Sequence, residues 1–304
     1  MITYVKNTEI DTEKWDECIR RSVNSIPYVF SWYLDIVVDT WDALILNDYE
    51  AVFPLPYKQK YTFNYVFTPF WIQQLGLFSR TYRGLDRIDD FILAIPKHFK
   101  YVDLNLNHHI SLNNASNYKL KKQNNFLLDL NEPYNKLEQR YSKNLLRNLK
   151  KSKSNELHLF KNDSPKVLID LFKRDRGSKI FSFSEMDYKN IETIMQVSIY
   201  KHCGQIWMAY GEGNIPLAGI FLLFGYSRVV LLFTGNSSRG KEVGAMPFLI
   251  DEFIKESSNS SFLFDFEGSN DENLARFYKG FGGEKYPYQK ITINQLPFPF
   301  KYFK

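Results

Sequence analysis

Two hydrophobic periodicities divide this chain into predicted strands and helices. Apolar and polar residues alternate over 101–107, which is typical of a strand with one buried face. Over 134–154 apolar residues instead recur at every fourth position, which predicts a helix with one apolar stripe. The stripe consists of Leu137, Tyr141, Leu145 and Leu149.

The pattern of the first half predicts a strand, two helices, three strands, a helix and a strand. The strands are predicted at 2–5, 43–46, 51–55, 61–67 and 101–107, and the helices at 11–21, 28–38 and 85–95. Asp11 is placed to cap the first of these helices, and Pro96 ends the last. Two short runs, 118–121 and 126–130, are predicted to close a hairpin.

The second half repeats this order of elements. Its strands are predicted at 157–161, 206–210, 217–224, 228–234, 262–266 and 288–293, and its helices at 165–174, 188–201, 243–256 and 271–280, with a loop at 235–242. Because the halves share this order with little sequence identity, we expect two copies of one α+β unit. The predicted limits are an N-terminal domain at 1–132, a basic linker helix at 133–154, a C-terminal domain at 155–296, and a tail at 297–304 packing on the N-terminal domain.

Composition agrees with two ordinary folded domains. The chain has 304 residues, of which 44% are hydrophobic and 17% aromatic. A formal net charge of +5 permits an anionic ligand or nucleic acid without requiring either. No signal peptide or membrane span is expected from the apolar pattern, and the two cysteines form no motif, so we expect a cytoplasmic protein.

A phosphate-binding loop is the first candidate site. The stretch 229–283 predicts a strand, a basic glycine-bearing loop, a helix, a strand that ends in carboxylates and a second helix. A loop of this kind before a helix can hold phosphate on its backbone amides. The candidate residues are Arg239, Gly240, Lys241, Gly244 and Ala245, and the alternative is an ordinary basic loop.

Two further segments are candidates for contacts with substrates. The linker helix carries Lys143, Arg147 and Lys150, which could contact phosphates of a donor or substrate or could form a solvated face. Trp71, Gln73 and Gln74 are predicted to line an acceptor pocket, against the alternative that this segment only plugs a sheet edge.

Several other chemistries find no support in the motifs. Neither a G-x-S-x-G nor a Walker A run occurs, and the five histidines form no H-x-x-x-H pair. The adjacent His108 and His109 are expected to point in different directions, so we predict no metal site.

The order of elements resembles the GNAT acyltransferase superfamily. Two copies joined by a basic helix are similar to its FemABX branch, the peptidoglycan-bridge aminoacyltransferases and their relatives. Three features carry the resemblance: Pro54-Leu-Pro56 followed by Gln73-Gln-Leu-Gly76; Tyr141-Ser-Lys143-Asn144 with Arg147, Lys150 and Lys151; and Asp265-Phe-Glu-Gly-Ser269 followed by Ala275-Arg-Phe-Tyr-Lys-Gly-Phe-Gly282. The resemblance implies tandem GNAT-like domains, each a mixed, mainly antiparallel sheet flanked by helices.

The resemblance also implies where a donor would bind. It would thread between the strands at 229–234 and 262–266 of the second copy. CoA-using members carry Q/R-x-x-G-x-G/A after the first of these strands, and this chain has Lys241-Glu-Val-Gly244-Ala-Met246. Members that use aminoacyl-tRNA carry a Phe-Lys-Lys-x-Phe-like run, and this chain has Phe277-Tyr-Lys-Gly-Phe281. Met246 and Tyr278 therefore depart from the two donor signatures.

Four residues near these motifs are candidates for catalysis. Asp265 and Glu267 alternate with Phe264 and Phe266, so we expect both carboxylates on one face of their strand. Either carboxylate could accept a proton from an attacking ammonium. Tyr278 and Lys279 could assist the leaving group. The alternatives are a helix-capping or strand-end hydrogen bond for Asp265 and a surface position on a helix for Tyr278 and Lys279.

These features lead to two functional hypotheses. The first is an N-acyltransferase without a prosthetic group, which takes an acyl or aminoacyl group from acyl-CoA or aminoacyl-tRNA. Its acceptor would be an amine of a small molecule, a peptide or a cell-wall precursor, and tRNA would be a candidate partner. The alternative is a non-catalytic binding protein that retains the duplicated fold and a ligand groove.

Overall fold

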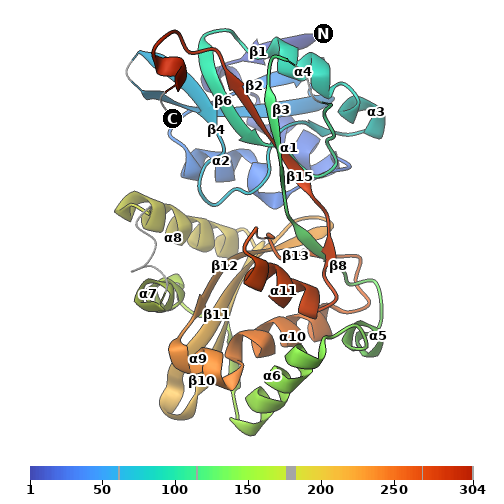
Figure 1. The fold of residues 1–304 in the computed structure, drawn as a ribbon, viewed down its shortest axis with the longest axis vertical. Helices are drawn as coiled ribbons and strands as arrows, with labels where there is room; N and C mark the ends of the chain where they lie inside the picture. The colour runs from blue at the N-terminus through green and yellow to red at the C-terminus, as the bar shows by residue number, and fades with distance from the viewer. Residues whose placement is uncertain (61, 114–115, 176–182, 269, 303–304) are drawn as a thin grey trace. The chain divides into compact units, whose positions relative to one another are not determined.

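The computed structural model describes residues 1–60, 62–113, 116–175, 183–268 and 270–302. The chain forms two units, Met1–Asn124 with Tyr286–Lys304, and Asn125–Lys285. Each unit is built on one sheet with helices packed against it (Figure 1). The predicted α+β class with mixed, mainly antiparallel sheets is confirmed.

The sheet of the first unit takes strands from both ends of the chain. In spatial order they are β1 (Ile2–Val5), β2 (Trp41–Leu46), β3 (Ala51–Lys60), β4 (Phe63–Phe67), β6 (Phe99–Asn105), β15 (Tyr288–Asn294) and β7 (Lys119–Gln123), with β5 (Phe78–Ser79) beside β3. The pair β4–β6 is parallel. The helices are α1 (Thr12–Arg21), α2 (Ser31–Val37), α3 (Tyr82–Leu85) and α4 (Ile88–Ala94).

The second unit holds a sheet of seven strands. In spatial order they are β14 (Glu284–Lys285), β8 (Phe126–Asp129), β13 (Leu263–Asp265), β12 (Arg228–Asn236), β11 (Ile215–Phe224), β10 (Gly204–Gly211) and β9 (His158–Lys161). The pair β12–β13 is parallel, in contrast to the antiparallel pairs on either side of it. This change of direction sits at the centre of the sheet.

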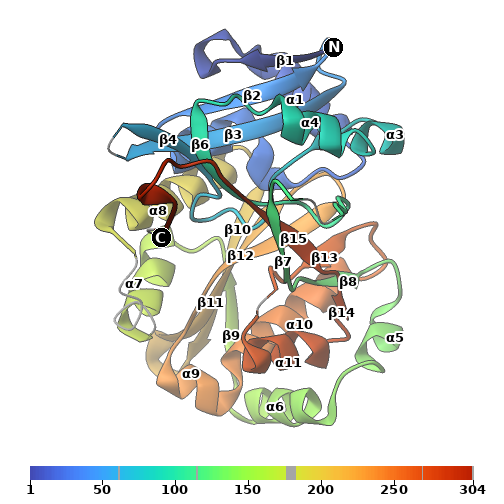
Figure 2. The ribbon, with the colours of Figure 1, turned by 45° about the horizontal axis from the view of Figure 1, so that its top comes forward.

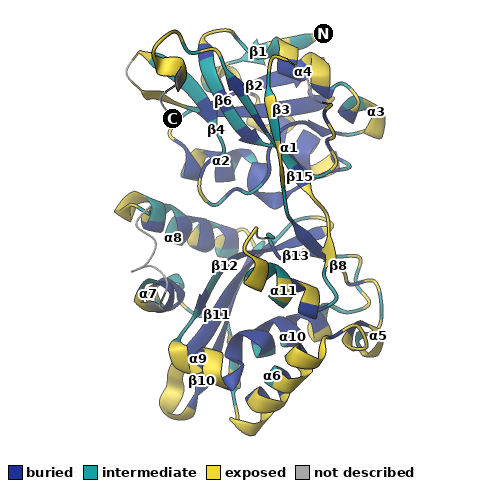
Figure 3. Cartoon of the chain, in the orientation of Figure 1, coloured by how far each residue is buried: buried dark blue, intermediate teal, exposed yellow. Residues whose placement is uncertain are grey.

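Helices cover both faces of the second sheet (Figures 1 and 2). One face packs against α7 (Pro165–Asp175) and α8 (Glu185–Tyr200). The other packs against α10 (Ala245–Ser257), which in turn contacts α6 (Lys143–Ser154). The helices α5 (Tyr134–Glu138), α9 (Ser238–Val243) and α11 (Glu272–Gly280) complete this layer. The strands are mostly buried, whereas the outer face of α6 is exposed (Figure 3).

The predicted helix over 134–154 is in fact two helices. α5 ends at Glu138, and the Ser142 side chain accepts a hydrogen bond from the Leu145 N–H at 3.2 Å, which caps α6. Around the break, the hydroxyls of Tyr134 and Tyr141 both donate to Asp251 Oδ1 on α10, at 2.8 and 2.9 Å. The apolar stripe thus continues across a capped break.

Two other local predictions are wrong. The runs near 118–121 and 126–130 form no hairpin, because β7 pairs with β15 in the first unit and β8 pairs with β13 and β14 in the second. The predicted loop at 235–242 contains α9, whose start is capped by Ser237 accepting from the Gly240 N–H at 2.9 Å.

The units divide the chain differently from the predicted domain limits. The helix α6, predicted as a linker, lies within the second unit, and β15, predicted for the C-terminal domain, lies in the sheet of the first. The tail follows β15, and the rings of Phe300 and Phe63 lie 5.4 Å apart in the first unit. Among the described helices, none is both long and apolar enough to cross a membrane.

Candidate active site

The two parallel strands of the second unit separate after a short paired region. Arg228, Val229 and Val230 of β12 pair with Leu263, Phe264 and Asp265 of β13. β13 ends at Asp265, whereas β12 continues to Asn236 alongside β11. Beyond Val230, the edge of β12 that faces β13 therefore has no strand partner within the described residues. The backbone groups along that edge can bind a ligand.

A cavity of about 350 Å³ lies along this open edge. It is lined by Leu231, Thr234, Gly235 and Asn236 of β12, by Lys241, Met246, Pro247 and Ile250 from the following helices, by Leu274, Phe277 and Tyr278 of α11, and by Asn148 and Phe172. Phe172 belongs to α7, on one face of the sheet, and Ile250 belongs to α10, on the other. The cavity is thus lined from both faces of the sheet.

A second cavity, of about 600 Å³, adjoins the first. It lies between α6 and α11 and shares Asn148 and Phe277 with the cavity beside β12. Its lining includes Arg276 and Lys279, and Lys241 lies exposed at the first cavity. Three cations therefore border the two cavities, and no Asp or Glu is among the described residues that line them.

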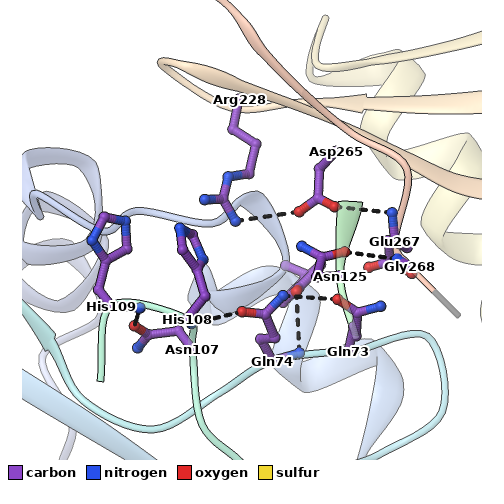
Figure 4. A network of polar contacts seen from close by, with 11 residues as sticks. Gln73, Gln74, Asn107, His108, His109, Asn125, Arg228, Asp265, Glu267 and Gly268 are labelled. Carbon is purple, nitrogen blue, oxygen red and sulfur yellow. Dashed lines mark hydrogen bonds and ion pairs between the residues drawn. The ribbon is translucent and has the colours of Figure 1, made fainter. Parts of the chain in front are cut away.

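The carboxylate of Asp265 is fully buried in a hydrogen-bonded cluster (Figure 4). Its Oδ2 lies 3.3 Å from Arg228 Nη1, and its Oδ1 accepts from the Glu267 N–H at 2.9 Å. Burial raises the pKa of Asp265, and the charge of Arg228 opposes this effect. These contacts match the strand-end hydrogen bond considered as the alternative for this residue, with a buried ion pair added to it.

Glu267 lies beyond the end of β13, so the strand alternation expected to place it on the face of Asp265 does not extend to it. The strand ends at Asp265, and Glu267 adopts a positive φ of 49°, which breaks the alternation of faces. Glu267 Oε1 is buried and has no hydrogen-bond partner among the described residues. Burial, and then the charge of Asp265, raise the pKa of Glu267 well above its usual range. Its carboxyl group therefore holds a proton more tightly than an exposed glutamate.

Asn125 completes this polar cluster, and the sequence analysis did not single it out. It is fully buried, and its Oδ1 accepts from the Gly268 N–H at 2.6 Å. Arg228, which is 4% exposed, was missed as well. The sequence did offer a signal for Arg228, because it is a cation that directly follows a turn and begins an apolar strand.

Comparison with solved structures identifies the architecture. FemX superposes with a TM-score of 0.66 at 12% identity, covering 94% of this chain and 96% of FemX. A conserved protein of unknown function from Bacteroides thetaiotaomicron gives 0.63 at 8% identity, covering 97% and 100%. The C-terminal domain of a putative lysylphosphatidylglycerol synthetase from Agrobacterium fabrum gives 0.57 at 13%, covering 96% and 93%. The chain has the tandem GNAT-like fold of FemX.

This finding confirms the predicted tandem GNAT-like domains, and at such low identities it concerns the fold alone. No protein-family model matches the sequence. No curated protein matches it either.

The predicted phosphate loop of the second GNAT-like unit is mostly a packing element. A Cβ on Gly240 would lie 2.3 Å from the Leu217 oxygen, and one on Gly244, whose φ is +76°, would lie 2.5 Å from the Asn148 oxygen. The N–H groups of Gly240 and Gly244 are bonded to Ser237 Oγ and to the Gly240 oxygen. These two glycines allow the neighbouring backbone oxygens to approach closely, and their N–H groups already have hydrogen-bond partners.

The side chains of this loop lie apart from one another. Lys241 lines the cavity beside β12. Arg239 lines a different cavity, of about 850 Å³, and pairs with Glu242 at 3.1 Å. Ala245 is fully buried. Of the predicted donor residues, Lys241 therefore has its side chain at the open strand edge.

The remaining second-unit candidates also fall into separate places. Tyr278 lines the cavity and stacks on Phe266 with ring centroids 4.9 Å apart, on the sheet face opposite to Asp265. Lys279 is exposed in the adjoining cavity. On α6, the cations Lys143, Arg147 and Lys150 are exposed and do not line these cavities, whereas Asn144 and Asn148 do. The sequence could have indicated these two asparagines, because they lie four residues apart and next to the apolar stripe of α6, and so share one face of the helix.

The predicted acceptor residues lie in a hydrogen-bonded loop of the first GNAT-like unit (Figure 4). Gln74 is fully buried, its Nε2 donates to Gln73 Oε1 at 2.7 Å, and its Oε1 accepts from the His108 N–H at 2.8 Å. Trp71 has a positive φ of 66°, and its carbonyl accepts from the Tyr33 hydroxyl. These bonds fix the shape of the loop, and the acceptor pocket stays a prediction.

The two neighbouring histidines in the segment after β6 differ from expectation. The ring centroids of His108 and His109 lie 4.2 Å apart, although the side chains were expected to point in different directions. The turn at these residues, held by the His109 N–H donating to Asn107 Oδ1 at 3.2 Å, explains the difference.

Proposed function

We propose that this chain is an N-acyltransferase that moves an acyl or aminoacyl group from a phosphate-bearing donor to an amine acceptor. The donor would be acyl-CoA or aminoacyl-tRNA, and the acceptor an amine of a small molecule, a peptide or a cell-wall precursor. The observation that carries the proposal is the cavity of about 350 Å³ along the open edge of β12. The GNAT-like fold, shared with FemX, supports it.

The cavity offers the positioning that acyl transfer requires. Polar backbone groups at the open edge of β12 can bind the donor and polarise its carbonyl, so the reaction needs no nucleophilic side chain. Alignment of the carbonyl with an amine supplies a large part of the rate, because the reaction becomes effectively unimolecular. The three cations at the two cavities would attract the donor phosphates.

Proton transfer and leaving-group contacts would then fall to three of the four residues that the sequence suggested. Asp265 is committed to Arg228, so Glu267 is the better candidate to take a proton from the acceptor ammonium, and because it does not line the donor cavity it would do so through water. Tyr278 lines the donor cavity and could donate a hydrogen bond to the leaving group. Lys279, in the adjoining cavity, would contact the donor farther from the reacting bond.

Donor binding and donor consumption test this proposal together. We expect butyryl-CoA or an acylated tRNA to raise the melting temperature, as any ligand that binds only the folded state does. Lys241→Ala should weaken that effect about tenfold in apparent affinity, in line with the loss of one phosphate contact. Lys255→Ala, in the exposed last turn of α10, should not.

The alternative of a non-catalytic binding protein gives a different result. Its specific support is the packing role of Gly240 and Gly244, whose N–H groups already have hydrogen-bond partners. A binding protein would be stabilised by a donor without consuming it. If a panel of primary amines brings about no release of free CoA or uncharged tRNA, the transferase proposal fails in favour of this alternative.

A further inference from the structure

Among the described residues that line the donor cavity and the cavity adjoining it, the charged side chains are cations. Among the described residues that line it, the ionisable side chains are Lys241 and Tyr278, and the adjoining cavity adds Arg276 and Lys279. Asp265 and Glu267 line neither cavity. A bound group with a positive charge would therefore meet cations and no carboxylate in the described lining.

The interior of the cavity is largely apolar. Leu231, Met246 and Ile250 are 4%, 7% and 0% exposed and line it with Phe172, Leu274 and Phe277. An ammonium group that entered this interior would lose its water and gain no partner of opposite charge. Such a transfer is costly, whereas a hydrocarbon group gains from it.

Apart from the Lys241 ammonium, the polar side-chain atoms of the described lining are neutral. Asn236 Oδ1 is buried without a hydrogen-bond partner among the described residues, and Asn148 contributes a second amide. An amide oxygen can accept a hydrogen bond from an uncharged N–H or O–H of the donor. It cannot neutralise an ammonium, because a buried charge needs a counter-charge.

We propose that the group transferred by this chain is an uncharged, mainly apolar acyl group that bears no ammonium. This inference rests on the acyl transfer proposed above and adds the chemical class of the transferred group. In the step itself, the acceptor nitrogen forms a C–N bond with the donor carbonyl and the C–S or C–O bond to the donor breaks. The leaving sulfur or oxygen ends with the proton that the amine loses.

Matched donor pairs test the inference with the full-length protein. Butyryl-CoA and β-alanyl-CoA differ in a terminal methyl against an ammonium, and phenyllactyl-tRNA and phenylalanyl-tRNA differ in a hydroxyl against an amino group. Dissociation constants for all four come from equilibrium dialysis. In whichever pair binds, we expect the uncharged member to bind about 100-fold more tightly, because the ammonium is buried without a partner.

A charge placed in the lining should reduce the preference for the uncharged donor. Asn148→Asp keeps the shape of a side chain that lines the cavity and adds a carboxylate, so the ratio within a pair should fall at least about tenfold. Asn144→Asp, one turn earlier on α6 and lining only the adjoining cavity, should leave the ratio unchanged.

The outcomes separate this inference from the proposed function. Equal binding of both members of a pair to the unaltered protein, or tighter binding of the ammonium member, would overturn the inference and leave acyl transfer standing. Absence of binding by all four donors would overturn the proposed function itself. If Asn148→Asp does not fold, the ratio of dissociation constants within a donor pair, measured with the unaltered protein, still tests the inference.

Discussion

At the scale of residues, the polar cluster around Asp265 contributes to how stability depends on pH. A folded-state pKa raised above the unfolded value means that the folded chain binds the proton more tightly. The free energy of unfolding should therefore fall as pH rises from about 4.3, the ordinary value for glutamate, through the raised folded-state pKa of Glu267.

Glu267→Gln removes the pH-dependent contribution of this carboxyl group to the free energy of unfolding. We expect the variant to be more stable than the unaltered protein at pH 8, with a shallower pH dependence of the urea midpoint. Glu284→Gln, which alters an exposed carboxylate, should follow the unaltered profile. Parallel profiles for Glu267→Gln and the unaltered protein between pH 5 and 8 would contradict the burial of this group.

At the scale of elements, the junction of α9 and α10 depends on Gly244. Alanine there meets both the positive φ of 76° and the Asn148 oxygen at 2.5 Å. We expect Gly244→Ala to lower the free energy of unfolding by about 3 kcal/mol, from backbone strain and overpacking combined. Gly213→Ala, at a φ of 68° with nothing within 4 Å, isolates the strain and should cost about 1 kcal/mol.

Urea denaturation of both variants measures the difference between them. Equal losses would show that α6 and α10 do not approach closely at this point. Because Asn148 also lines the donor cavity, Gly244→Ala should weaken donor binding as well, and Gly213→Ala should not.

The sequence predicted most elements, because their periodicity is local. Asp11 and Ser142 show the limit: the Asp11 cap was found from its place before an apolar helix, whereas the Ser142 cap was hidden inside a continuous apolar stripe. The pairing of β15 with β6 joins residues far apart in the sequence, and no local pattern encodes it. The segments that hold the candidate residues could be found from the sequence. The face of the sheet on which each residue lies, opposite for Asp265 and Tyr278, depends on where the strands end.

At the scale of the whole molecule, the second unit is an insertion in the first. The pairing of β7 with β15 matches Gln123 with Tyr288, and the pairing of β8 with β14 matches Phe126 with Lys285. All seven strands of the second sheet lie within 125–285, whereas the first sheet needs β15 between β6 and β7.

Fragments should therefore differ in their ability to fold. We expect 125–285 to unfold cooperatively on its own and 1–124 to remain unfolded, because β7 loses its partner. Joining 1–123 to 288–304 through a short Asn-Gly turn should restore folding, since this creates a β7–β15 hairpin. Circular dichroism melts of the three fragments check this, and a cooperative melt of 1–124 alone would contradict the assignment.

The most direct test of the central claim is donor binding to a protein whose β12 cavity has been filled. Thr234→Trp places an indole in that cavity, and Ile215→Trp places the same group in the separate cavity of about 850 Å³. In equilibrium dialysis with a labelled acyl donor, Thr234→Trp should lose at least about tenfold in affinity, about 1.4 kcal/mol, and Ile215→Trp should bind normally. Undiminished binding by a folded Thr234→Trp protein would contradict a donor site between β12 and β13.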